Sequence, residues 1–121
     1  TLQILYSLDL KNGFNIEQAE IECENIKKRN KLVNNKFYFE KLVKGVIKDK
    51  DDLDKYINEK AIDWTISRMA VVDRNILRLA LYEINNDLVP VGVAIYEAVE
   101  LAKEYGDEKS PGFINGILSR A

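Results

Sequence analysis

The sequence predicts an all-α fold, a bundle of about six to seven helices joined by short connections. Apolar residues recur at three- and four-residue intervals along most of the chain. Clusters of Asn, Gly and Pro separate these segments and predict turns between helices. The segment Arg68–Ile84 is apolar around most of its circumference, which predicts a central helix enclosed by the others.

This central segment reads RMAVVDRNILRLALYEI. Its few charged positions are expected on a narrow exposed strip, because the apolar residues occupy the rest of the helix surface. The strip consists of Asp73, Arg74 and Arg78. The apolar face and its flanks comprise Met69, Val72, Ile76, Leu77, Leu79, Ala80, Leu81 and Ile84.

The first helix is predicted over Thr1–Leu10, and Asn12-Gly13 ends it. Because this segment starts without Met, cap or polar lead-in, we expect further residues upstream. A second helix begins at Asn15, with Gln18 completing a capping box. It ends in the basic run Lys27–Lys31, predicted as a solvated helix end, with contact to RNA phosphates as the alternative.

The third helix is predicted to open at Asn34-Asn35 and to run through to Lys60. Its segment KDKDDLDK is dense in both charges and predicts a solvated surface rather than a calcium loop. Trp64 then follows as an expected core or hinge anchor, because so large an aromatic dominates local burial.

After the central helix, Asn85-Asn86-Asp87 predicts a turn, and Pro90 is expected to be the first residue of the next helix. Gly106 ends that helix. Ser110 is expected as cap of a last short helix, in which Gly112 and Gly116 allow close packing. The inward residues are expected to be Val91, Ala94, Ile95, Ala98, Leu101, Ala102 and Tyr105, then Phe113, Ile114, Ile117 and Leu118.

Composition argues against several classes of function. The 121 residues include no His and a single Cys, Cys23, which disfavours a disulfide framework, a Ser-His or Cys-His nucleophile and a His-based metal site. No phosphate-binding glycine loop and no apolar run of membrane-spanning length is present in this sequence. We therefore predict a protein that is not an enzyme, with no cofactor, no metal and no membrane span.

Two features point to nucleic acid despite a net charge of −2. The first is the basic run between Lys27 and Lys36, since a local basic patch is the relevant footprint. The second is the pair Tyr6 and Phe113, because aromatic side chains stack on unpaired RNA bases. Ordinary core packing is the alternative for both aromatics.

The segments SRMAVVDRNILRLALYEI, VPVGVAIYEAVELAKEYG and SPGFINGILSRA resemble the NusB family of transcription antitermination factors. The first segment, TLQILYSLDL, is similar to the first helix of that family, so the resemblance covers the whole chain. It is specific in the second half and weak over residues 11–60.

The resemblance implies a single domain, residues 1–121, built from two packed three-helix subdomains over residues 1–60 and 61–121. It implies a bacterial, cytoplasmic RNA-binding factor that pairs with NusE, a small-subunit ribosomal protein. Together they are expected to bind the single-stranded boxA element of ribosomal RNA leaders and to help RNA polymerase resist termination. Monomer and homodimer are both compatible with this pattern.

The resemblance also implies site residues. Tyr6 and Phe113 stand at the family's two aromatic RNA positions, with Gln3 one turn before Tyr6 and Lys109 in the loop ahead of Phe113. Asp73 stands where the family has an acidic residue facing NusE, and the neighbouring Arg74 and Arg78 are expected on that side. The arginine-rich segment that the family carries before its first helix is expected upstream of Thr1.

Two other functions remain compatible with the sequence. The chain could be the RNA-binding domain of an rRNA cytosine methyltransferase, in which a related helical domain precedes the catalytic part. It could also be a helical protein-interaction scaffold without an RNA role, and loss of RNA affinity with rising salt would separate that alternative from an RNA-binding protein.

Overall fold

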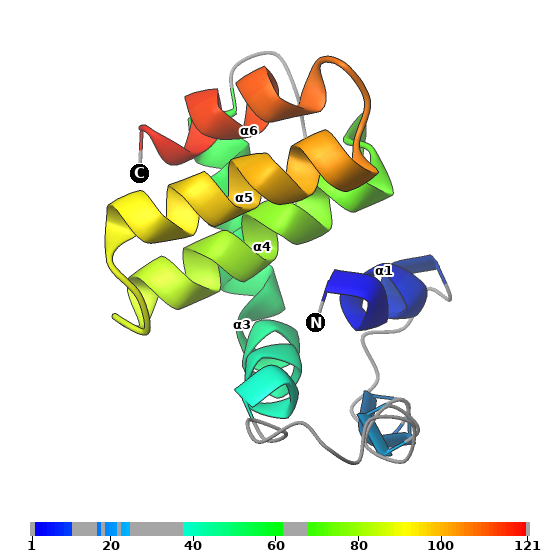
Figure 1. Ribbon diagram of the computed structural model, residues 1–121. Helices are drawn as coiled ribbons and strands as arrows, with labels where there is room; N and C mark the ends of the chain where they lie inside the picture. Colours follow the sequence, from blue (N-terminus) through cyan, green and yellow to red (C-terminus); the bar gives the residue numbers. More distant parts are fainter. Residues whose placement is uncertain are drawn as a thin grey trace.

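The computed structural model describes residues 2–10, 17, 19–21, 23–24, 38–61 and 68–120, and within them it contains helices and no strand. The helices, labelled as in Figure 1, are α1 (Leu2–Leu10), α3 (Tyr38–Lys60), α4 (Val71–Asn85), α5 (Val91–Tyr105) and α6 (Ser110–Leu118). The predicted all-α fold is confirmed. The features expected at Asn15, Lys27–Lys36 and Trp64 lie outside the described residues.

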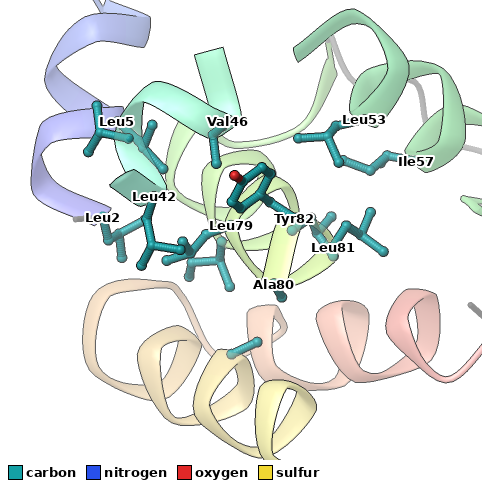
Figure 2. Packing of buried hydrophobic residues seen from close by; sticks show 14 of the residues in the cluster. Leu2, Leu5, Leu42, Val46, Leu53, Ile57, Leu79, Ala80, Leu81 and Tyr82 are labelled. Carbon is teal, nitrogen blue, oxygen red and sulfur yellow. The ribbon is translucent and has the colours of Figure 1, made fainter. Parts of the chain in front are cut away.

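Helix α4 lies at the centre of the molecule and contacts α1, α3, α5 and α6. In Figures 1 and 2, α5 and α6 pack together on one side of α4, while α1 and the first half of α3 lie on the other. Because neighbours surround it, every side chain from Asn75 to Glu83 is buried. The central helix predicted over Arg68–Ile84 is therefore confirmed, except that it begins at Val71 and ends at Asn85.

Helices α3 and α4 approach closely where a glycine faces an aromatic ring. The Tyr82 ring reaches from α4 toward α3 beside Val46, as Figure 2 shows. A Cβ atom on Gly45 would overlap the Cζ, Oη and Cε2 atoms of that ring. Gly45 therefore provides the space in which Tyr82 is buried.

The turn predicted at Asn85-Asn86-Asp87 is confirmed, and it ends α4 in a defined way. Asp87 has a φ of 52°, in the left-handed region that commonly terminates helices. Its N–H donates to the Ile84 carbonyl at 3.2 Å, and the Leu88 N–H donates to the Glu83 carbonyl at 3.0 Å. This is the pair of bonds of a Schellman motif, with Asp in the position that glycine usually occupies.

Helix α5 buries a line of small residues, Ala94, Ala98 and Ala102, spaced four apart. Such residues allow the helix to lie close to its neighbours. The expectation that Val91 and Tyr105 point inward is wrong, since they are 51% and 45% exposed. They lie at the two ends of α5, beyond the stretch that its neighbours cover.

The corner between α5 and α6 differs from the predicted arrangement. Ser110 was expected as the cap, but it is already the first helical residue, and Lys109 precedes it at the N-cap position. The side chain that bonds the backbone ahead of α6 is that of Asp107. The Asp107 carboxylate accepts from the Ser110 N–H at 3.1 Å, while the Asp107 N–H donates to the Ser110 hydroxyl at 3.0 Å. This reciprocal pair is a capping box.

The glycines at this corner and in α6 match the sequence prediction only in part. Gly106 follows the end of α5 as predicted, and a Cβ there would meet the Ser110 side chain. Among the residues that the structure describes, close packing at Gly112 and Gly116 is not observed, because a Cβ at either position would meet none of them within 4 Å. In the part of the chain described here, no helix has the length and apolar character needed to cross a membrane.

We expect Gly45→Ala to destabilise the protein by about 1–3 kcal/mol, because overpacking against Tyr82 outweighs the better helix propensity of alanine. Urea unfolding monitored by circular dichroism measures this change.

The matched control is Gly92→Ala in α5, where a Cβ would meet none of the described residues within 4 Å. This variant is expected to be more stable than the parent by up to about 1 kcal/mol. Equal stability of the Gly45→Ala and Gly92→Ala variants would contradict the close packing of Tyr82 on α3.

Candidate functional site

A pocket of about 330 Å³ lies between the first turns of α4 and α6. It brings together three of the residues singled out from the sequence, Asp73 of α4, Lys109 before α6 and Phe113 of α6. The remaining lining residues are Arg68, Met69, Ala70, Asp107 and Ser110.

Asp73 is the buried charged group of this pocket, with a residue exposure of 8%. It lies in the first turn of α4, yet the residue that caps this helix is Ala70 and no side chain bonds to the cap. The Oδ1 atom of Asp73 is buried and receives no hydrogen bond from the residues that the structure describes. Leaving a buried carboxylate oxygen without a hydrogen bond costs free energy.

The surroundings of Asp73 disfavour its charge. Burial raises the pKa of its carboxyl group above the usual value of 3.8, and the negative charge of Asp107 raises this pKa further. The neighbouring Ser110 hydroxyl acts in the opposite direction on this pKa without reversing the shift. A cation brought into the pocket would relieve this unfavourable state.

The rest of the pocket is mixed in character. Phe113 is half-buried and packs against the core, while Lys109 and Arg68 are exposed. One side of the pocket thus offers a carboxylate, and its rim offers an aromatic ring and cations. This combination suits binding of both a protein cation and RNA. The described residues include no group of three His, Cys, Asp or Glu side chains that could hold a metal ion.

Gln3 and Tyr6 lie away from this pocket, on the exposed face of α1 together with Leu10. The alternative that Tyr6 is an ordinary core residue is wrong, because it is 37% exposed. The opposite face of α1 enters the core through Leu2, Ile4, Leu5 and Leu8. The Tyr6 ring is therefore available for contact with a ligand, and the half-buried Phe113 ring is partly available.

The narrow exposed strip expected on α4 is not present. Asp73 is buried, Arg78 is 3% exposed, and the Arg74 side chain is largely covered. The reason is that both arginines pair with carboxylates of other helices. Their predicted contact with a partner protein stays a prediction, alongside this role inside the molecule.

The arginines form a buried ionic network, defined here as Asp9, Asp54, Arg74, Asn75 and Arg78. The Asp9 carboxylate accepts from Arg74 Nε at 2.6 Å and also from Arg74 Nη2, which makes the pair bidentate. Its Oδ2 also accepts from Asn75 Nδ2 and from Arg78 Nη1, each at 2.9 Å.

Arg78 joins a third helix to this network. Its Nε and Nη2 donate to the two carboxylate oxygens of Asp54 in α3, at 2.6 and 3.0 Å. Lys50 Nζ also reaches Asp54, at 2.9 Å. One guanidinium of α4 therefore holds α1 and α3 at the same time.

The network stabilises its own charges. Burial alone would raise the pKa of Asp9, but hydrogen bonds from Arg74 and Asn75 and the charges of Arg78 and Arg74 outweigh burial and lower it below 3.8. The hydrogen bond to Asp9 correspondingly raises the pKa of Arg74. Asp9 is therefore ionised at neutral pH, in contrast to the unfavourable charge of Asp73.

The partners of these arginines could not be identified from the sequence. Nothing in the local pattern distinguishes Asp9 and Asp54 from the solvated acids around them, because they meet Arg78 across 69 and 24 residues of chain. Asp107 could have been found, since Asp-x-x-Ser before a helix is a capping-box spacing.

Comparison with known proteins identifies relatives over the whole length of the chain. The model of the NusB family matches residues 1–121. The transcription antitermination protein NusB of Halothermothrix orenii is 56% identical over 120 residues, which cover 99% of this chain and 89% of that protein.

Two solved structures are similar to this fold. T. maritima NusB has a TM-score of 0.85 at 30% identity, covering 98% of this chain and 82% of that chain. A crystal structure of the antitermination factors NusB and NusE in complex with double-stranded RNA has a TM-score of 0.81 at 29% identity, covering 98% and 87%. With its sequence matched from end to end and its fold shared, the chain belongs to the NusB family.

Proposed function

We propose that this chain is an RNA-binding transcription antitermination factor that acts together with NusE. The observation that carries the proposal is that Asp73, Lys109 and Phe113 line one pocket. A group suited to a protein cation thus lies next to groups suited to RNA. Membership of the NusB family supports the same function, since a relative forms a complex with NusE and RNA.

The RNA surface that we propose consists of Gln3 and Tyr6 on α1 with Lys109 and Phe113 at the start of α6. The exposed ring of Tyr6 and the half-buried ring of Phe113 offer faces for stacking, and Lys109 offers a charge for phosphates. Stacking of this kind favours unpaired bases, as expected for boxA-type RNA. The complex with double-stranded RNA known for a relative makes the duplex form a necessary comparison.

The NusE contact that we propose centres on Asp73. Its buried, incompletely bonded carboxylate fits a basic side chain of a protein partner, and ribosomal proteins are rich in such side chains. We propose further that the resulting complex joins the RNA polymerase antitermination assembly, which places the protein in the cytoplasm.

Adding NusE is expected to raise the affinity for single-stranded boxA-type RNA, because the two ligands meet at adjoining parts of one pocket. Fluorescence titration of labelled RNA with and without NusE measures this effect, with the duplex form as a second arm. An RNA affinity that NusE leaves unchanged would argue against the shared surface.

Replacing Tyr6 with Ala is expected to weaken RNA binding by about tenfold, since one stacked base contributes about 1–3 kcal/mol. Phe113→Ala is expected to weaken binding similarly but to cost more stability, because Phe113 also packs against the core. RNA titration at two salt concentrations, combined with thermal unfolding, measures both effects.

The matched control is Tyr96→Ala in α5, which removes a tyrosine that is 67% exposed and lies outside the proposed RNA surface. It is expected to leave RNA affinity within about twofold of the parent. A loss equal to that of Tyr6→Ala would place the RNA on α5 instead.

Asp73→Asn is expected to weaken NusE binding by at least about tenfold, because it removes one partner of a buried charge pair. The same substitution should raise the midpoint of thermal unfolding at pH 7. Because the pKa of Asp73 is raised in the folded state, the native protein binds more protons than the unfolded chain above pH 3.8. The free energy of unfolding therefore falls as the pH rises from 3.8 through the folded-state pKa. The advantage of Asn should therefore disappear in acid, where Asp73 is neutral.

Isothermal titration with NusE and thermal unfolding over a pH series measure these two effects. Asp52→Asn in α3 is the control, since it removes an exposed carboxylate outside the proposed surface. NusE binding that is unchanged by Asp73→Asn would remove the partner role from this residue.

A further inference from the structure

The position of α1 on the rest of the molecule is fixed by one carboxylate near its C-terminal end. Asp9 receives hydrogen bonds from three polar side chains on one face of α4, those of Arg74, Asn75 and Arg78. The Asp9 side chain is only 9% exposed, so these bonds are protected from water.

These bonds fix the rotation of α1 about its axis and its position along α4, which the apolar contacts of α1 do not. Burial of Leu2, Ile4, Leu5 and Leu8 holds α1 against the core, but the hydrophobic effect has no direction. A small rotation of α1 or a slip along α4 would preserve much of that burial. The bidentate pair between Asp9 and Arg74 has fixed geometry, and it opposes both movements.

Tyr6 is close to this anchor on the helix. It precedes Asp9 by three residues, which places the two side chains about 60° apart around the axis of α1. Asp9 points toward α4, whereas Tyr6 and Gln3 lie on the exposed face. Any rotation permitted by loss of the Asp9 bonds would therefore turn the Tyr6 ring away from its present direction.

We propose that Asp9 is a positioning residue for RNA binding, which orients Tyr6 and Gln3 relative to the pocket through its bonds to Arg74, Asn75 and Arg78. The inference rests on the proposed function, because it concerns the same RNA surface. It assigns to the bonds of Asp9 a role in RNA binding beyond their contribution to stability.

A double-mutant cycle tests this role with four proteins, the parent, Asp9→Asn, Tyr6→Ala and the double variant. Each is titrated with single-stranded boxA-type RNA in the presence of NusE, at a temperature where circular dichroism shows it folded. Asp9→Asn is expected to weaken RNA binding by about fivefold in the parent and by less than about twofold in the Tyr6→Ala background. A purely structural role would weaken binding by the same factor in both backgrounds.

The control is Asp54→Asn, which removes the other carboxylate of the network. Asp54 binds the same Arg78 but belongs to α3, which carries none of the proposed RNA residues. This variant is expected to lose stability while its RNA affinity stays within about twofold of the parent. If Asp9→Asn does not fold, the same cycle is run with Arg74→Gln at a saturating concentration of NusE. This variant removes the bidentate pair and leaves the bonds to Asp9 from Asn75 and Arg78.

The outcomes separate the two proposals. If the parent protein with NusE does not bind RNA, the proposed function itself fails. If the parent binds RNA but Asp9→Asn leaves affinity unchanged, or weakens it equally with and without Tyr6, the positioning role is overturned. Loss of RNA affinity in Asp54→Asn equal to that in Asp9→Asn would also overturn it.

Discussion

The rest of the structure depends on the side chain of Arg78. Its guanidinium lies in the interior with bonds to α1 through Asp9 and to α3 through Asp54, so one cation links three helices. An isolated buried charge would be very costly, and the two carboxylates and Asn75 compensate the charge of Arg78. Removal of either carboxylate would therefore leave the charge of Arg78 less well compensated and lower the stability of the fold.

The ionic network and the apolar core stabilise different parts of the fold. Helices α5 and α6 lie on the other side of α4, where small residues such as Ala80 and Ala98 are buried and allow close packing. Non-directional burial holds that side together, whereas directional ionic bonds align α1 and α3. The residues proposed for RNA lie on elements from both sides, α1 and α6.

Much of the fold could be predicted from the sequence because local residue patterns indicate where its helices and turns lie. Helical periodicity located α4 and α5, and Asn85-Asn86-Asp87 marked the turn between them. The surroundings of Arg74 and Arg78 could not be predicted, since periodicity places charges on a helix without saying which distant acids they meet. The charged strip was therefore expected in solvent, but it is covered.

The candidate site was predictable only in part. Tyr6, Phe113 and Asp73 could be singled out from their residue types and positions. Resemblance to the family supplied their binding roles, which stay predictions. The structure shows that Asp73 and Phe113 line the same pocket. Their proximity depends on tertiary packing, because α4 and α6 come into contact only in the folded chain. The structure also revealed the incompletely bonded oxygen of Asp73, a property of packing that no sequence pattern encodes.

The shared pocket has a consequence for regulation. Ligands that meet at one pocket influence each other reciprocally, because the factor by which the first changes the affinity of the second must equal the reverse factor. If protein and RNA both bind there, neither is solely the effector. The concentration of unbound protein partner would then set how much RNA is occupied, and the supply of RNA would equally control how much of that partner is sequestered.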